Sequence, residues 1–265
     1  MAIDLKAAIK KTKGLDDAPS ICLHGTSGVG KTTFGAGAPN PIFIQTEAGQ
    51  GLLEINTFNF GDDGISTSYV EVVEAIDALI NQKHNYYSLV IDSIDHLEPL
   101  MWAHLCSENN WTTIDKAGYG AGYNAAAAEW RVLLKKLNEL RKRKKMAIIL
   151  IAHNQMRKID EPGQTQIDRW DLKLHQKSAS VITETVDCVL YAKHQVKMRK
   201  EDKGFGQTKT IGIDTGERIL VCQGGPHVNA KNRYNLPDEI PLSWEGFEQA
   251  LQESIKPKQK EQANG

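Results

Sequence analysis

The chain has 265 residues with 32 Lys and Arg against 33 Asp and Glu, so its formal net charge is only −1. This balance excludes an overall basic field, and any contact with nucleic acid has to come from a local patch. No apolar stretch approaches the ~20 residues of a membrane span, and the first residues lack the apolar core of a signal peptide. The four cysteines are far apart, which favours reduced core thiols in a cytoplasmic protein over zinc ligands or disulfides.

An apolar run at Ile21–Leu23 predicts a buried strand after a polar lead-in of residues 1–19. The strand runs into Gly-Thr-Ser-Gly-Val-Gly-Lys-Thr, a complete P-loop of the form G-x-x-x-x-G-K-[ST]. In this motif the glycines let backbone N–H groups surround a phosphate, the Lys reaches the β- and γ-phosphates, and the last hydroxyl ligates Mg²⁺. We predict that ATP is bound by Gly25, Thr26, Ser27, Gly28, Val29, Gly30, Lys31, Thr32 and Thr33.

The rest of the chain predicts an α/β domain. Short apolar strands are expected at residues 41–44, 88–91 and 147–151, with helices at 69–82 and 124–145. Apolar strands separated by helices are typical of a mostly parallel sheet covered on both faces. The later residues predict antiparallel strands at 186–196, 208–214 and 218–223, with a hairpin turn at Asp214-Thr215-Gly216. A helix at 242–254 ends a single domain over residues 20–254, before a disordered polar tail at 255–265.

Two carboxylates follow predicted strands at the edge of the sheet where α/β proteins bind ligands. Asp92 comes directly after Leu89-Val90-Ile91 and is expected to hold Mg²⁺ through water, next to Thr32. The residue after Asp92 is Ser93, so no adjacent Glu is present to activate water. Glu47, just past the second strand, is therefore the candidate general base, and a solvated loop carboxylate is the alternative.

A polar run follows the strand at 147–151, and we expect Gln155 to face the γ-phosphate; ordinary polarity at a strand end is the alternative. The next segment, Arg157–Ser178, is predicted to be a long polar loop that binds single-stranded DNA. Its cations suit phosphates and its aromatic ring suits a base, although incidental surface charge is the competing interpretation. The candidate DNA-binding residues are Arg157, Lys158, Arg169, Trp170, Lys173 and Lys177. The segment Ser107–Tyr123 is a second candidate loop. The basic run at 141–145 is better explained as the cationic end of a helix.

The P-loop, Glu47, Asp92 and the run Asn154-Gln155-Met156-Arg157 together resemble the core of RecA-type recombinases. More closely, the chain resembles bacteriophage nucleotide-binding proteins of the RecA-like ATPase group, which include Sak-type minimal recombinases and single-strand annealing proteins. The resemblance covers about residues 20–242. It implies that Glu47 is the catalytic base and that Gln155 links the γ-phosphate to a mobile DNA-binding loop. Lys31 of the P-loop is the third residue of the same subunit that we expect to be catalytic, beside Glu47 and Gln155.

The same resemblance implies an assembly in the cytoplasm of a bacterial host cell. RecA-like rings and filaments complete their sites with cations from the next subunit, and Lys231 and Arg233 are the candidates here; a basic surface turn is the alternative. A homo-oligomer, single-stranded DNA and a single-strand binding protein are the implied partners. The chain has room for little beyond the core, which favours annealing or a mediator role over complete strand exchange.

Other classes of P-loop protein remain as alternatives. The chain has no Asn-Lys-x-Asp motif, so guanine specificity is not expected. A small-molecule kinase shares the P-loop, but no Arg-rich lid is evident. An ATP-switched binding module with negligible hydrolysis differs from an ATPase only in whether Glu47 and a cation from a second subunit are in place.

Overall fold

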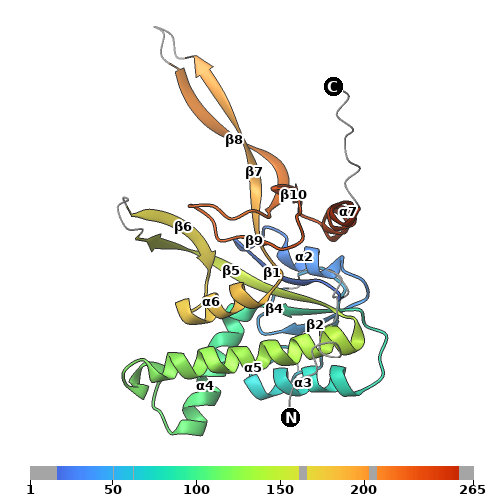
Figure 1. Cartoon of the computed structure of the whole chain (residues 1–265), viewed down its shortest axis with the longest axis vertical. Coiled ribbons are helices and arrows are strands. Elements are labelled where there is room, and N and C mark those ends of the chain that lie inside the picture. Colours follow the sequence, from blue (N-terminus) through green and yellow to red (C-terminus); the bar gives the residue numbers. More distant parts are fainter. Residues whose placement is uncertain (1–16, 50, 62, 161–165, 203–207, 257–265) are drawn as a thin grey trace, which may run out of the picture.

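A central, mostly parallel β-sheet organises the computed structural model, which describes residues 17–49, 51–61, 63–160, 166–202 and 208–256 (Figure 1). Nearly all of the predicted lead-in and polar tail lies outside these residues. The sheet has the strand order β10-β8-β7-β1-β5-β4-β2-β3, and β6 and β9 pair with β5 and β7. The strands are β1 (Ser20–Gly25), β2 (Pro41–Gln45), β3 (Asn56–Thr57), β4 (Ser88–Asp92), β5 (Ala147–Ile159), β6 (Ile167–Leu172), β7 (Cys188–Asp202), β8 (Thr208–Val221), β9 (Lys231–Asn232) and β10 (Glu239–Pro241). The helices are α2 (Lys31–Ala36), α3 (Tyr69–Asn81), α4 (Ile94–Asn109), the 3₁₀ turn η1 (Ile114–Ala117), α5 (Ala121–Lys144), α6 (Gln176–Thr185) and α7 (Trp244–Ile255).

The direction of the strands agrees with the fold class predicted from the sequence. β1 is parallel to both β5 and β7, and β4 is parallel to both β5 and β2. β8 is antiparallel to β7, and β10 is antiparallel to β8. Because β5 lies between β1 and β4, a third strand end stands between the P-loop and Asp92. The predicted α/β sheet with C-terminal antiparallel strands is confirmed.

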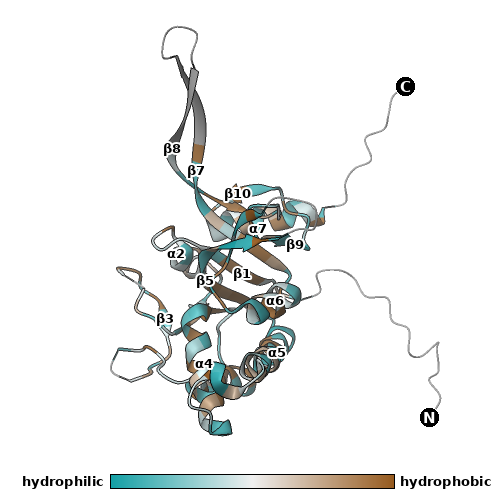
Figure 2. Cartoon of the chain, turned by 90° about the vertical axis from the view of Figure 1, so that its left-hand side faces the viewer, coloured by the Kyte–Doolittle hydropathy of each residue, from teal (hydrophilic) through white to brown (hydrophobic). Residues whose placement is uncertain are grey.

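Two hydrophobic clusters cover the two faces of the sheet, which explains why its central strands are apolar throughout. Ile21 and Leu23 of β1 pack with the side chains of α2 and α7, whereas Cys22 faces the opposite cluster under α3, α4, α5 and α6. Figure 2 shows the apolar strands enclosed between helices with polar outer surfaces. The predicted apolar stripe of α5 is buried at Trp130, Leu133, Leu134, Leu137 and Leu140.

The helices of the described part of the chain include none with the length and apolar character that a membrane span requires.

Two local predictions are wrong. The segment Arg157–Ser178 is not a loop: β5 continues to Ile159 and returns as β6, with Arg157 opposite Arg169, before α6 begins. The pairing of backbone groups satisfies a polar strand as well as an apolar one, so polarity alone did not reveal this hairpin. Within the hairpin, residues 161–165 lie outside the described part of the chain.

The predicted turn at Asp214-Thr215-Gly216 is a bulge inside one long strand. β7 and β8 pair on both sides of it, and the register shifts between His194 and Val196. Gly216 has φ 75°, a conformation that suits glycine, and the Thr215 hydroxyl donates to the Gln195 carbonyl at 3.1 Å. Turn-forming residues thus bend the β7–β8 ribbon, which projects from the body of the molecule (Figure 1).

Candidate nucleotide-binding site

The P-loop connects β1 to α2 and brings the side chain of Lys31 inside the loop. Gly28 and Gly30 adopt φ of 76° and 109°, which turns the backbone around the position of a phosphate. The Lys31 Nζ donates to the carbonyls of Gly25 and Thr26 at 3.0 and 2.9 Å, and the residue is only 6% exposed. Burial lowers the pKa of Lys31, while the charge of Asp92 acts in the opposite direction. The amine is therefore held in place by groups that an incoming phosphate can replace.

Thr32 and Asp92 form the expected metal-binding pair. The Thr32 hydroxyl donates to Asp92 Oδ2 at 2.8 Å, which joins the start of α2 to the end of β4. Burial raises the pKa of Asp92, and the hydrogen bond from Thr32 partly offsets this effect. A divalent cation at this position would favour the ionised carboxylate and would find two oxygen ligands of the kind Mg²⁺ prefers.

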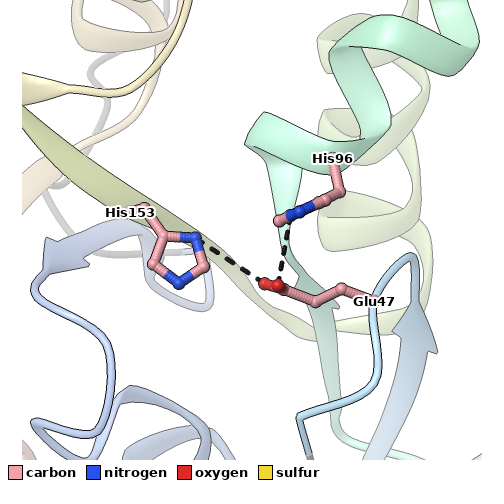
Figure 3. Close-up of side chains that lie close together, drawn as sticks. All are labelled: Glu47, His96 and His153. Atoms are coloured by element: carbon pink, nitrogen blue, oxygen red, sulfur yellow. Dashed lines mark ion pairs between the residues drawn. The ribbon is translucent and has the colours of Figure 1, made fainter.

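Glu47 lies on the segment after β2 and reaches the same cavity. Thr46 fixes this segment to the end of β4: its N–H donates to the Asp92 carbonyl at 2.9 Å, and its hydroxyl donates to the Ser93 carbonyl at 2.6 Å. Figure 3 shows the Glu47 carboxylate between two imidazole rings. Its Oε2 is 3.2 Å from His96 Nδ1, and its Oε1 is 3.8 Å from His153 Nδ1. The Glu47 carboxylate thus lies at the cavity, close to two imidazole rings.

His153, rather than Gln155, is the residue of β5 that lines this cavity. It stands beside Gly25 in the sheet register and was visible in the sequence only as one polar residue in a run. Asp95 holds it, accepting from the His153 N–H at 2.9 Å and lying 3.0 Å from the ring Nδ1. Burial opposes ionisation of Asp95, but these contacts outweigh it and lower the pKa of Asp95. Sequence reasoning missed His153, Asp95 and His96.

Gln155 lies two residues further along β5 and binds the β5–β6 hairpin. Its Nε2 donates to the carbonyls of Leu172 and Leu174 at 2.9 and 3.2 Å. The amide therefore connects the strand that carries His153 to the segment that returns from β6.

Arg218 of β8 is a further cation that the sequence did not reveal. Its Nη1 donates to the Val29 carbonyl at 3.3 Å, and a Cβ placed on Gly30 would lie 2.9 Å from that nitrogen. Arg218 lines the cavity of about 370 Å³ together with Lys31, Thr32, Glu47 and Asp92. Because Arg218 lies far from Thr32 in the sequence, only the fold of the C-terminal strands brings it to the P-loop.

The two candidate cations for a neighbouring subunit lie near the start of β7, far from the P-loop edge of the sheet. Lys231 Nζ donates to the carbonyls of Thr183, Glu184 and Val186 at 2.6 to 2.8 Å, so it closes the C-terminal end of α6 in its own chain. Arg233 donates to the Glu184 carbonyl at 3.1 Å, and its side chain remains 53% exposed. Of the two, Arg233 is the more available to a second molecule.

The candidate DNA-binding residues separate into two groups. Arg157, Lys158 and Arg169 line a second cavity of about 490 Å³ between the hairpin and α6, and the Arg169 Nε is buried without a hydrogen-bond partner among the described groups. The others lie elsewhere. Trp170 stacks on Tyr191 with ring centroids 6.4 Å apart, and Lys173 Nζ is 3.8 Å from Asp95 Oδ2. Lys177 donates to Asn124 Oδ1 on α5.

The second candidate loop, Ser107–Tyr123, is only partly a loop, because it includes the end of α4, the turn η1 and the start of α5. Tyr123 lies on α5 and stacks on His175 with ring centroids 4.0 Å apart, whereas Tyr119 is fully exposed. The basic run at the end of α5 has a structural role at Arg141, whose Nη2 is 2.5 Å from Asp187 Oδ2.

This chain is similar to known proteins at the level of a family model and of a solved structure. The crystal structure of the RadB recombinase superimposes with a TM-score of 0.44 at 16% sequence identity, over 87% of this chain and 90% of that chain. A search of curated proteins returned no match. The family described as the AAA domain matches residues 17–234, which span β1, the P-loop, Glu47 and Asp92. A P-loop domain binds nucleotide, generally with Mg²⁺. Because the match covers more than half of its 265 residues, this chain belongs to the AAA domain family.

Proposed function

We propose that this protein is a RecA-like, Mg²⁺-dependent ATPase that acts on single-stranded DNA. The observation that carries the proposal is the convergence of Lys31, Thr32, Asp92 and Glu47 on one cavity of about 370 Å³. These residues supply a phosphate-binding amine, two ligands for Mg²⁺ and a carboxylate base, which are the parts that phosphoryl transfer to water requires.

In the proposed reaction, Lys31 exchanges its two carbonyl partners for the β- and γ-phosphates of ATP. Thr32 and, through water, Asp92 would hold Mg²⁺, which when bound would neutralise charge on the phosphate oxygens. Glu47 orients the attacking water and accepts its proton. Arg218 and His153 border the same cavity and are placed to stabilise charge as the γ-phosphoryl group departs.

We assign single-stranded DNA to the second cavity and the adjoining hairpin. Arg157, Lys158 and Arg169 supply cations there, and guanidinium and ammonium groups suit the phosphate oxygens of DNA. Asp171 and Glu184 line the same cavity, and Asp171 lies 3.7 Å from Arg157 Nε. Arg157 therefore shapes the cavity, while Arg169 and Lys158 bind phosphate.

Coupling between the two sites is proposed to run through β5, which carries His153 at the nucleotide cavity and Gln155 at the base of the hairpin. The biological setting we propose is a phage homo-oligomer, a ring or a filament, in which Arg233, with Lys231 behind it, reaches the next subunit. Its role is annealing, recombination or repair beside a single-strand binding protein.

The test of this function is ATP turnover by the purified protein with and without single-stranded DNA. We expect turnover that requires Mg²⁺ and rises when single-stranded DNA is added. Single-strand affinity, measured with and without a non-hydrolysable ATP analogue, then tests the coupling. Turnover without any DNA binding at low salt would refute the recombination role, and nucleotide binding without turnover would leave an ATP-switched module.

The role of Glu47 is tested by Glu47→Gln, which keeps the shape of the side chain and removes the base. Loss of a general base costs 10²–10⁴-fold in rate, so turnover should fall by about that factor while nucleotide affinity is retained. Glu54→Gln is the matched control, because Glu54 is an exposed carboxylate seven residues further along the same connection. A wild-type rate in Glu47→Gln would place the base elsewhere.

The DNA site is tested by Arg169→Ala against Arg143→Ala. Arg143 is an exposed cation at the far end of α5, paired with Glu139 at 2.7 Å. Removing one phosphate contact should lower the salt dependence of DNA binding by about one unit. We expect this change in Arg169→Ala and not in Arg143→Ala. Equal behaviour of the two variants would contradict the assignment of the cavity.

A further inference from the structure

Two imidazoles and a carboxylate converge at one side of the nucleotide cavity in a manner that the ATPase reaction does not require. Glu47, His96 and His153 come from three separate elements: the segment after β2, the first turn of α4, and β5. Each offers one ligand atom, and these atoms all lie within 4.8 Å of one another (Figure 3). Two histidines and one glutamate form a ligand set that zinc uses in proteins.

The distances suit one small cation between these side chains. Zinc bonds to imidazole nitrogen and carboxylate oxygen are about 2.1 Å long, so ligand atoms in a tetrahedral site lie about 3.4 Å apart. The Nδ1 atoms of His96 and His153 are 3.2 and 3.8 Å from the two oxygens of Glu47. Asp95 Oδ2 lies 3.7 and 3.0 Å from the same two nitrogens, so a second carboxylate faces them.

Neighbouring groups hold Asp95 in place and act on the charge of the cluster. The Asp95 side chain is 2% exposed and is fixed by the backbone N–H of His153. The Ser93 hydroxyl lies 2.8 Å from His96 Nδ1, the atom that would bind the metal, so a bound ion would replace this contact. With neutral imidazoles the cluster contains two carboxylates. Lys173 Nζ lies 3.8 Å from Asp95 Oδ2, and the charge of Lys31 also acts on both carboxylates.

We infer that Glu47, His96 and His153, with Asp95 as a fourth oxygen donor, form a binding site for a divalent transition-metal ion such as Zn²⁺. This site is separate from the Thr32–Asp92 pair, whose two oxygens suit the hard Mg²⁺ ion, whereas imidazole nitrogens select the later transition metals. The consequence for regulation rests on the proposed function of Glu47. A carboxylate bound to zinc cannot accept a proton from water, so zinc should inhibit ATP turnover without displacing the nucleotide.

The direct test needs no ATPase activity. Zn²⁺ is titrated calorimetrically into the metal-free full-length protein without nucleotide, and Co²⁺ is added in parallel so that its visible absorption bands report the coordination geometry. We expect one Zn²⁺ per chain, retained in excess Mg²⁺, and Co²⁺ bands of tetrahedral intensity. Loss of a residue that only supports a metal ligand weakens metal binding by about 10–100-fold. Loss of a ligand itself, in His96→Gln, should therefore weaken Zn²⁺ binding at least ~100-fold.

The matched control is His104→Gln, which removes another histidine of α4, one that lies 3.4 Å from Glu108 and outside the cluster. It should bind Zn²⁺ as the wild type does. Glu47→Gln supplies a second loss of a ligand, and circular dichroism verifies that each variant is folded. Failure of the folded wild type to bind Zn²⁺ more tightly than both His96→Gln and Glu47→Gln would overturn the proposed site.

Inhibition is measured as the ratio of turnover with and without Zn²⁺ in each protein. A ratio well below one means that Zn²⁺ inhibits turnover. Such a ratio in the wild type and in His104→Gln, together with a ratio near one in His96→Gln, supports regulation through Glu47. Zinc binding without a change in this ratio would refute the regulatory step. If the protein has no turnover, the proposed function fails, and the calorimetric titration still decides whether the metal site exists.

Discussion

His24, the last residue before the P-loop, should make the stability of the protein depend on pH between about 7.5 and 5. Its ring is fully buried on β1 and lies 2.7 Å from the Asn229 carbonyl through Nε2. Burial lowers the pKa of His24 from 6.5 to about 4, although the contact with Asn229 acts in the opposite direction. The unfolded chain therefore binds a proton over a pH range in which the folded chain stays neutral.

The sign and size of the effect follow from this difference. Because the folded-state pKa is depressed, the full stability is present above pH 6.5 and is lost as the pH falls toward 4. For a pKa of 6.5 in the unfolded state and about 4 in the folded state, lowering the pH from 7.5 to 5.0 should cost about 2 kcal/mol of unfolding free energy from this one group.

The assay is urea-induced unfolding at pH 7.5 and 5.0, compared between the wild type and His24→Gln. Glutamine can still donate to a carbonyl but does not titrate. The destabilisation caused by the substitution itself is therefore the same at both pH values, and it cancels when the unfolding free energies of one protein at the two pH values are subtracted. The variant should lose about 2 kcal/mol less than the wild type between the two conditions. His104→Gln, which removes a histidine outside the core, should behave like the wild type. Equal losses in the wild type and His24→Gln would refute the reasoning.

Further predictions concern the nucleotide site, the assembly and the core. Lys31→Ala should remove most nucleotide affinity, because the phosphates lose their cation; unchanged binding in equilibrium titrations would contradict the P-loop assignment. Arg218→Ala should weaken transition-state stabilisation by about 1.5–3 kcal/mol, the value of a charge-assisted hydrogen bond, as measured by kcat/KM; an unchanged ratio would exclude it from the site. Arg233→Ala should lower turnover more than affinity, and wild-type activity per subunit should rise with concentration; a monomer with a constant rate would contradict both. Gly122→Ala should destabilise the protein by about 1–3 kcal/mol in urea unfolding, because the new Cβ would lie 2.0 Å from the Ile114 carbonyl oxygen; a gain in stability, as expected from helix propensity alone, would show that η1 moves aside.

Local sequence patterns were sufficient for the P-loop, the parallel core and the position of Asp92. A phosphate-binding loop requires a contiguous set of residues, so its chemistry can be read directly from residues 25–32. The apolar strands were equally visible, because a sheet covered on both faces needs apolar side chains at every position. Glu47 could be placed at the same cavity as the P-loop for a related reason, since the carboxyl ends of parallel strands meet at one edge of the sheet.

The tertiary structure alone decided which side chains surround these residues. His96 and Asp95 lie on α4, His153 lies on β5 and Arg218 lies on β8, and no spacing in the sequence relates them to Glu47 or to the P-loop. Strand register also decided that His153 borders the nucleotide cavity while Gln155 binds the hairpin, because β5 pairs with β1 up to His153 and continues beyond that edge of the sheet to pair with β6. Backbone pairing made a strand of the polar residues after Arg157, since hydrogen bonds along a ladder do not depend on the side chains.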